Sequence, residues 1–189
     1  MASGKPLTPW FGHDRTLEQQ MMGLDRLFAQ IEGKTVLDVG CAEGLISIEC
    51  VKSGAKEVMG VEVRIKAWEE ANRIAAKAGL IDRRLGFLHD DANTFDPDPE
   101  PGYWDIILLL TVLHKLKNPT ASCARLVAAA KDLVVIRLPP EHAPTIIDAR
   151  SGNQPHHIGI TMDKAGFELE HSSYDGPFGE WVGYYRRRK

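Results

Sequence analysis

Short apolar runs alternate with stretches of helical periodicity along this chain, which predicts an alternation of strands and helices. Five apolar runs predict buried strands, at 35–39, 57–63, 84–89, 105–111 and 133–138. Apolar residues spaced as on one helical face predict helices at 16–33, 45–54, 67–78 and 119–130, and another ending at 166. The last two strands, 167–174 and 181–187, are close enough to pair as an antiparallel hairpin. This order predicts an α/β fold, an open sheet with helices on both faces.

Capping signals mark the ends of two of the predicted helices. Thr16 and Gln19 have the spacing of a capping box, and Gly33 suits a C-terminal cap, so one continuous helix is predicted between them. Asn118 stands directly before Pro119, a residue favoured at the first helical position. Each of these helices is therefore expected to begin at its capping residue.

Composition limits the chain to one domain with a short arm. The 189 residues are 43% hydrophobic, and residues 1–15 mix Pro, Gly, Ser and Thr, so we expect an N-terminal arm at 1–15 and one domain at 16–189. The longest wholly apolar run, 106–110, is too short to span a membrane, and no signal peptide is predicted. Three widely spaced cysteines argue against a disulfide framework, which favours a cytoplasmic location.

The charge balance gives nucleic acid little to bind. The formal net charge is −3, from 23 basic and 26 acidic residues, so no overall basic field exists. The last four residues, 186–189, are all cationic. Nucleic acid therefore stays an open partner, but a solvated chain end is the favoured interpretation of this tail.

A glycine-containing turn follows the first predicted strand, in the sequence VLDVGCAEG at 36–44. A strand, a tight turn and a helix start in this order let backbone N–H groups approach a ligand closely. The dinucleotide fingerprint would need a small residue at position 45, where this chain has Leu45. Asp38 would repel a pyrophosphate but suits an ammonium or sulfonium group. The turn thus disfavours a nicotinamide cofactor and favours a cationic ligand.

Acidic residues also end the next two predicted strands. Glu62 ends the strand 57–63, where a carboxylate can accept the hydroxyls of an adenosine ribose. Asp90, Asp91 and Ala92 follow the strand 84–89, where a carboxylate can accept an adenine amino group. Each acid alone could simply cap a turn. Because the carboxyl ends of parallel strands meet at one edge, all three acids are expected to converge there.

With these motifs the sequence resembles the class I S-adenosylmethionine-dependent methyltransferases. VLDVGCAEG resembles the first motif of that family, Glu62 the second, and Asp91 with Ala92 the third. The segment 103–116, YWDIILLLTVLHKL, resembles the fourth motif, and the resemblance extends over about 16–187. One departure is Ala42, where the family usually has glycine. Alanine is the least costly replacement, so we expect cofactor binding to be only slightly affected.

The resemblance implies a Rossmann-like open sheet of seven strands, mostly parallel, whose last strand runs antiparallel between strands five and six. It also implies S-adenosylmethionine as the cofactor, with its methionine part at the loop after the first strand. Glu62 would hold the ribose, Asp91 and Ala92 the adenine, and Thr111 would lie beside the reactive methyl group. The residues expected to bind the cofactor are Asp38, Gly40, Cys41, Ala42, Gly44, Glu62, Val63, Asp91, Ala92 and Thr111.

Candidate catalytic groups are few. His114 follows the fourth strand, where an acceptor would enter, and is the candidate general base; an ordinary histidine at a helix start is an equal alternative. Loop histidines without a Cys or Asp partner at ligand spacing are usually only polar lining, which applies to His142, His156 and His157. No metal is therefore predicted. Arg15, in the arm, could meet the carboxylate of the cofactor.

The predicted function is methyl transfer from S-adenosylmethionine to an unidentified acceptor, which we expect to be a small molecule. Acceptor recognition is expected from the arm 1–15 and the loop 139–157. The first alternative is an RNA or protein methyltransferase that docks through the cationic tail and through Arg83 and Arg84. The second is a non-catalytic subunit that binds S-adenosylmethionine.

Overall fold

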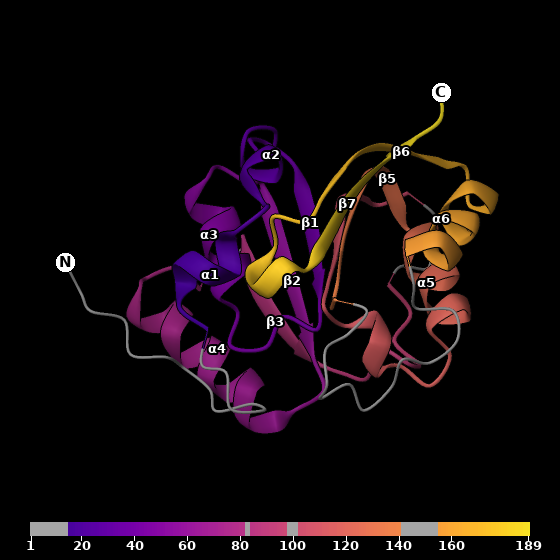
Figure 1. The fold of residues 1–189 in the computed structure, drawn as a ribbon. Coiled ribbons are helices and arrows are strands. Elements are labelled where there is room, and N and C mark those ends of the chain that lie inside the picture. The colour runs from indigo at the N-terminus through magenta and orange to yellow at the C-terminus, as the bar shows by residue number, and fades with distance from the viewer. Residues whose placement is uncertain (1–14, 82–83, 98–101, 141–154) are drawn as a thin grey trace.

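The computed structural model describes residues 15–81, 84–97, 102–140 and 155–189, and shows one sheet with a helical layer on each face (Figure 1). Seven strands form the sheet, in the order β3-β2-β1-β4-β5-β7-β6. Their bounds are β1 Thr35–Val39, β2 Glu57–Glu62, β3 Leu85–His89, β4 Trp104–Leu110, β5 Ala130–Leu138, β6 Phe167–Ser173 and β7 Trp181–Arg187. β1 to β5 pair in parallel, and β7 pairs antiparallel with both β5 and β6. The predicted sheet and its inserted last strand are confirmed.

The helices divide between the two faces of the sheet (Figure 1). One face carries α1 Leu17–Met21, α2 Asp25–Phe28, α3 Leu45–Lys52 and α4 Ile65–Lys77, and the other carries α5 Pro119–Ala128 and α6 Pro155–Lys164. Two short 3₁₀ helices, η1 Leu113–Lys115 and η2 Pro177–Gly179, follow β4 and precede β7. The capping box of Thr16 with Gln19 and the Asn118 cap form as predicted.

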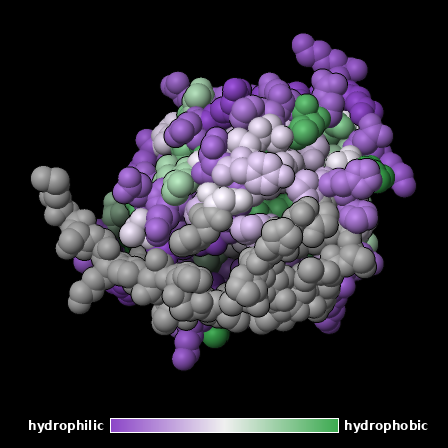
Figure 2. Space-filling view, viewed as in Figure 1, coloured by the Kyte–Doolittle hydropathy of each residue, from purple (hydrophilic) through white to green (hydrophobic). Residues whose placement is uncertain are grey.

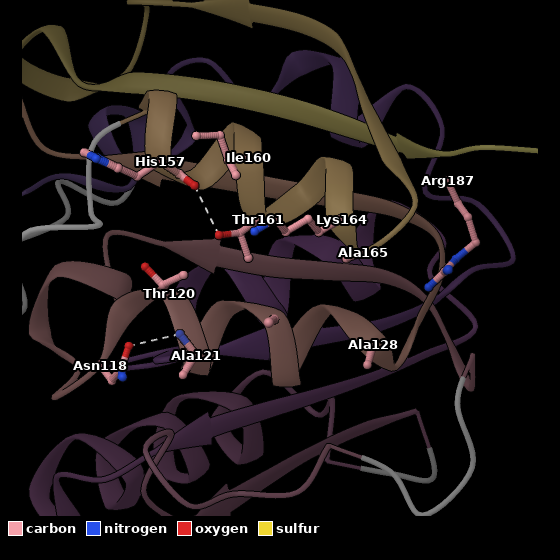
Figure 3. A pocket seen from close by; sticks show the side chains of 11 residues that line it. Asn118, Thr120, Ala121, Ala128, His157, Ile160, Thr161, Lys164, Ala165 and Arg187 are labelled. Carbon is pink, nitrogen blue, oxygen red and sulfur yellow. Dashed lines mark hydrogen bonds between the residues drawn. The ribbon is translucent and has the colours of Figure 1, made fainter.

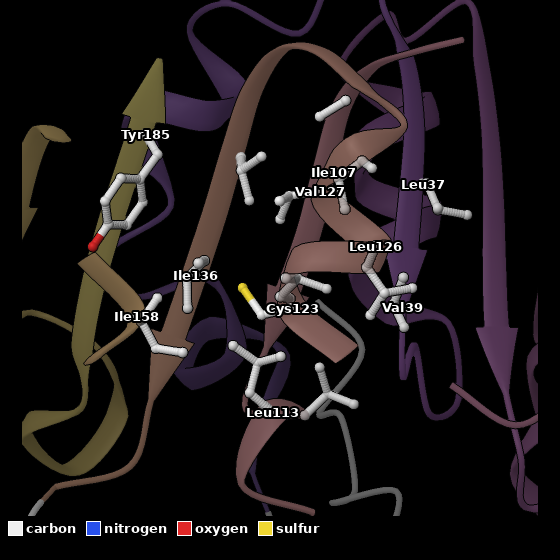
Figure 4. Close-up of a cluster of buried hydrophobic side chains, with 14 of the residues drawn as sticks. Leu37, Val39, Ile107, Leu113, Cys123, Leu126, Val127, Ile136, Ile158 and Tyr185 are labelled. Carbon is white, nitrogen blue, oxygen red and sulfur yellow. The ribbon is translucent and has the colours of Figure 1, made fainter. Parts of the chain in front are cut away.

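Each face of the sheet buries its own apolar cluster, because successive side chains of a strand point to opposite faces. Leu37 and Val39 of β1 pack with Ile107 and with Leu126 of α5 in one cluster (Figure 4). Val36, one position along β1, packs on the opposite face with the side chains of α3. β4 is apolar and buried on both faces, as its sequence predicts. The two clusters fix the sheet, and thereby the loops that leave its carboxyl edge.

The prediction of one continuous helix at 16–33 is wrong, because the chain breaks between α1 and α2 at Gly23. Gly23 has a φ of +75°, which a helix does not allow, and its carbonyl accepts a 2.6 Å hydrogen bond from the Tyr184 hydroxyl of β7. The guanidinium of Arg137 on β5 donates to the carbonyls of Gln20 and Met22, at 3.0 and 2.7 Å. These carbonyls would otherwise continue the helical ladder, so hydrogen bonds from distant strands end α1 early.

Smaller differences concern the ends of elements. β5 begins at Ala130, three residues before the predicted strand 133–138, because the turn after α5 is shorter than expected. β4 ends at Leu110 and β2 at Glu62, one residue before the predicted ends.

Most of the predicted arm, residues 1–14, lies outside the described residues, as do residues 141–154 of the loop with His142. None of the described helices is long and apolar enough to cross a membrane.

Candidate cofactor site

The loop after β1 lies tightly against the ends of its neighbouring strands. The N–H groups of Gly40 and Cys41 both donate to the carbonyl of Val61, at 2.8 and 3.1 Å. Gly40 has a φ of +77°, and a Cβ there would lie 2.8 Å from Cγ2 of Val112, which follows β4. Glycine is therefore required at position 40, both by the backbone conformation and by the space. The turn is built as the sequence predicts.

Two further residues of this loop adopt left-handed backbone conformations. Gly44 is the N-cap of α3 with a φ of +71°, and a Cβ there would lie 2.5 Å from the ring of Phe87. Ala42 has a φ of +51° although it carries a side chain. This conformation costs a non-glycine residue about 1–2 kcal/mol, so alanine at position 42 is a strained replacement and not a neutral one.

Asp38 is the second-last residue of β1, directly before this loop, and is buried. The hydroxyl of Ser47, on α3, donates to its Oδ2 at 2.6 Å. Burial raises the pKa of the Asp38 carboxyl from 3.8 to about 6, although the Ser47 hydrogen bond acts in the opposite direction. A cationic ligand group beside Asp38 would favour its ionised form. The carboxylate is therefore placed where an ammonium or sulfonium group would stabilise it.

The raised pKa of Asp38 makes fold stability depend on pH. The folded protein binds this proton more tightly than the unfolded chain, so the contribution of Asp38 to stability is fully present below about pH 4 and is lost as the pH rises through about 6. Asp38→Asn removes this loss and is expected to raise the free energy of unfolding at pH 8 by about 3 kcal/mol, while weakening cofactor binding. Urea unfolding at pH 4 and pH 8 measures the effect, with the exposed Asp25→Asn as control. Equal stability of wild type and Asp38→Asn at pH 8 would contradict it.

Glu62, at the end of β2, is buried and accepts three hydrogen bonds from the protein. Its Oε2 accepts from the N–H of Ala42 at 3.0 Å, and its Oε1 accepts from the N–H and the Nε of Arg64 at 2.9 and 3.0 Å. The bond to Ala42 holds the strained loop residue in place. The next residue, Val63, leaves an apolar side chain 54% exposed, which suits contact with a flat ring.

The loop after β3 carries Asp91, a carboxylate whose pKa is lowered, unlike that of Asp38. Oδ1 of Asp91 accepts from the N–H and the Nδ2 of Asn93, at 2.9 and 2.7 Å. The backbone hydrogen bond from Asn93, followed by that of its side chain, lowers the pKa of Asp91 below its ordinary value. Ala92 is buried, and its carbonyl accepts from Arg125 of α5 at 2.6 Å. Asp91 is thus an ionised acceptor on a loop that α5 holds in place.

Thr111 and His114 lie where β4 ends. Thr111 has a φ of +58°, and its N–H donates to the carbonyl of Arg137 at 2.9 Å, so the end of β5 holds this strained position. His114 is half-buried in η1, three residues further on. Burial raises the pKa of the Cys41 thiol well above its ordinary value, so this side chain stays neutral. The role of His114 as a base stays a prediction.

Arg15 makes a contact that its position in the sequence does not predict. Its guanidinium donates twice to Glu180, at 2.6 and 3.2 Å. Nε of Arg137 lies 3.8 Å from the same carboxylate. In this structure Arg15 therefore pairs with Glu180, which precedes β7. Glu180, Ser47 and Arg64 are polar partners of the site region that the sequence motifs do not mark.

A groove on the other face of the sheet is separate from this site. It lies between α5 and α6 and has a volume of about 690 Å³ (Figure 3). None of the residues predicted to bind the cofactor lines it. The rings of His156 and His157 at the start of α6 lie 5.7 Å apart. Within the described part of the chain, no group of three or more His, Cys, Asp or Glu residues could hold a metal ion.

The observed groups fit S-adenosylmethionine well. The Gly40 turn leaves no room for a side chain, Asp38 offers a buried carboxylate to a cation, Glu62 and Asp91 offer acceptors, and Val63 offers an exposed apolar surface. All of them leave the carboxyl ends of β1, β2 and β3, the edge at which open α/β sheets bind their ligands. Fold and site together define a nucleotide-cofactor-binding α/β domain.

Comparison with known families then identifies the chain. The family model described as a methyltransferase domain matches residues 36–133, just over half of the sequence. The chain therefore belongs to the methyltransferase domain family. The resemblance to the class I S-adenosylmethionine-dependent methyltransferases is confirmed, and with it the cofactor.

Curated relatives share part of this domain. A ribosomal protein L11 methyltransferase of Actinobacillus pleuropneumoniae is 27% identical over 119 residues, 63% of this chain and 39% of the relative. That of Haemophilus ducreyi is 37% identical over 73 residues, 39% of this chain and 23% of the relative. The matches span well under half the length of these relatives, so they extend to the shared domain only.

Solved structures show the same fold over nearly the whole chain. A magnesium protoporphyrin IX methyltransferase from Synechocystis PCC 6803 with bound SAH has a TM-score of 0.76 at 19% identity, covering 98% of this chain and 90% of that one. An Aquifex aeolicus SAM-dependent methyltransferase has a TM-score of 0.70 at 20% identity, covering 93% and 95%. At these identities the likeness establishes the fold.

Proposed function

We propose that this protein transfers a methyl group from S-adenosylmethionine to a small-molecule acceptor. The observation that carries the proposal is the convergence of Asp38, Glu62 and Asp91 at the carboxyl ends of three adjacent parallel strands, beside the Gly40 turn. Three carboxylates at the ends of adjacent strands suit a ligand that has a cationic group, a ribose and an adenine, one for each carboxylate.

In this proposal the protein acts mainly by alignment. Bound S-adenosylmethionine supplies an electrophilic methyl group on a sulfonium. Asp38 would hold the cationic methionine part, Glu62 the ribose and Asp91 the adenine, while Thr111 lies at the end of the neighbouring β4. Fixing the direction of attack can supply much of the rate enhancement of a displacement. For an acceptor that loses a proton, His114 is the proposed base.

The carboxyl-terminal arginines support a small acceptor over RNA. Arg186 pairs with Asp132 and Glu170, both at 3.0 Å, and Arg188 pairs with Asp163. Arg187 donates to the carbonyl of Ala130 and lies 4.4 Å over the ring of Phe167. Although the chain end forms a hydrophilic protrusion (Figure 2), its arginines already have partners within the fold. A phosphate backbone would have to compete with these contacts.

Radiolabelled methyl transfer into a cell lysate, fractionated by size, tests the acceptor class. Label in the low-molecular-weight fraction is the expected result, and it should be absent when Asp38→Asn replaces the wild type. Label in protein would overturn the small-molecule proposal in favour of a protein acceptor, a second candidate that the L11 methyltransferase relatives support. Label in RNA would also overturn it. Cofactor binding without transfer to any fraction would favour a non-catalytic binding subunit.

A further inference from the structure

Glu62 is already occupied by donors of its own chain. It accepts the N–H of Ala42 on Oε2, and both the N–H and the Nε of Arg64 on Oε1, within 2.9–3.0 Å. An ionised carboxylate offers about four acceptor positions, two on each oxygen. Three are filled here, and Oε1 is full. The two hydroxyls of a ribose need two acceptor positions, so one of the three internal donors has to leave.

The three donors differ in how easily they can move. The N–H of Ala42 belongs to the loop after β1, and the N–H of Arg64 belongs to the N-cap of α4, so both are fixed by the fold. The Nε of Arg64 is carried by a side chain that is 36% exposed, against 6% for Glu62. The guanidinium can turn towards water, where its charge is solvated at small cost. Of the three donors, Arg64 Nε is therefore the one that can leave.

Arg64 lies at a helix N-cap, but its side chain does not cap the helix. It is the N-cap of α4, a position where Ser, Thr, Asp or Asn usually accepts a hydrogen bond from the first turn, and it makes no side-chain cap bond. Instead, its guanidinium compensates the buried charge of Glu62. A buried carboxylate without a partner is costly, so this pairing stabilises the site as long as no ribose is bound.

We propose that Arg64 competes with the cofactor ribose for Glu62 and thereby sets the affinity of the site for adenosine-containing ligands. The inference rests on the proposed function, because it assigns the ribose to Glu62. With the ribose bound, Arg64 Nε gives up Oε1 to one hydroxyl, and the second hydroxyl takes the remaining position on Oε2. Because Arg64 must be displaced, the site binds the ribose more weakly than it would if Glu62 had no such partner. This effect applies only to ligands that carry both ribose hydroxyls.

Adenosine and 2′,3′-dideoxyadenosine, titrated calorimetrically, test the competition. The variant is Arg64→Met, which keeps length and apolar stem but neither charge nor donor. The matched control is Arg73→Met on the same helix, where Arg73 pairs with Glu70 at the surface. Where a nucleoside binds too weakly for direct titration, its affinity is measured by how well it displaces bound S-adenosylhomocysteine. Arg64→Met should bind adenosine about fivefold more tightly, the size of one modest hydrogen-bond exchange. Its affinity for dideoxyadenosine should be unchanged, and Arg73→Met should change neither.

Weaker adenosine binding by Arg64→Met, or an equal change for both ligands, would overturn the competition and make Arg64 a residue that merely positions Glu62. If Arg64→Met does not fold, Arg64→Leu serves instead, because it is also apolar and carries neither charge nor donor. It should also bind adenosine more tightly, without an effect on dideoxyadenosine. Failure of the wild type to bind S-adenosylhomocysteine would refute the proposed function itself, an outcome distinct from normal binding that Arg64 does not influence.

Discussion

Replacement of Glu180 by alanine is expected to lower the free energy of unfolding by about 3–5 kcal/mol. Glu180 is buried and accepts two hydrogen bonds from Arg15, and its carboxylate lies 3.8 Å from Nε of the buried Arg137. Burial lowers the pKa of Arg137 to about 10, and the charge of Glu180 opposes that shift. Without Glu180, the buried guanidinium of Arg137 would keep its charge but lose this carboxylate. Removing one partner of a buried ion pair is strongly destabilising, because it leaves a buried charge uncompensated.

Urea unfolding of Glu180→Ala and of a surface control measures this difference. Glu170→Ala breaks the pair with Arg186 at a side chain that is 46% exposed, and should cost less than about 1 kcal/mol. Because Arg137 also ends α1 through the carbonyls of Gln20 and Met22, Glu180→Ala should increase hydrogen exchange in the segment 15–23 as well. Equal losses for the two variants would contradict the central place of Glu180 in this network.

Replacement of Glu62 by alanine is expected to weaken binding of S-adenosylhomocysteine on the order of 10- to 100-fold. The variant loses the acceptor for the ribose and also the bond that holds Ala42 at a φ of +51°. Both losses act on the same ligand, so the effect should exceed that of one hydrogen bond. Calorimetric titration measures it, and the matched control is Glu70→Ala, a half-buried carboxylate on α4 that pairs with Arg73. Affinity within twofold of the wild type would contradict the placement of the ribose.

The central strands of the sheet could be predicted from the sequence because they are buried on both faces. β4 contains the apolar run 106–110, and β1 contains Val36 and Leu37 directly before Asp38. The carboxylates could be predicted as well, because in parallel strands the position of a residue at the strand end fixes the edge at which it lies. Asp38, Glu62 and Asp91 therefore follow from local sequence and topology alone.

The break between α1 and α2 could not be predicted, because its cause is distant in the sequence. The apolar spacing from Leu24 to Ile31 is helical, but the carbonyls of Met22 and Gly23 are taken by Arg137 and Tyr184, 115 and 161 residues away. The pairing of Arg15 with Glu180 spans 165 residues and has the same character. Local periodicity contains no information about such partners.

The positive φ angles of Ala42 and Thr111 could not be predicted from the sequence for a different reason. Ala42 and Thr111 adopt φ values of +51° and +58°, which their residue types disfavour, so composition points away from the observed conformation. Each donates its N–H to a neighbouring strand: Ala42 to the Glu62 carboxylate of β2, and Thr111 to the carbonyl of Arg137 on β5. Strain of this kind clusters at ligand sites, and both residues belong to the predicted cofactor site. Arg64 was missed because an arginine at an N-cap has no signature of its own.

Calorimetric titration of S-adenosylhomocysteine into the wild-type protein tests whether the carboxyl edge of the sheet binds the cofactor. Saturable binding to one site is expected. Gly40→Arg should abolish it, because a Cβ at position 40 would lie 2.8 Å from Val112 and a longer side chain would fill the cofactor loop. Gly33→Arg, at a glycine whose Cβ would meet nothing within 4 Å, is the control and should bind normally. A folded wild-type protein that gave no binding heat and no displacement would contradict the assignment of the carboxyl edge as an S-adenosylmethionine site.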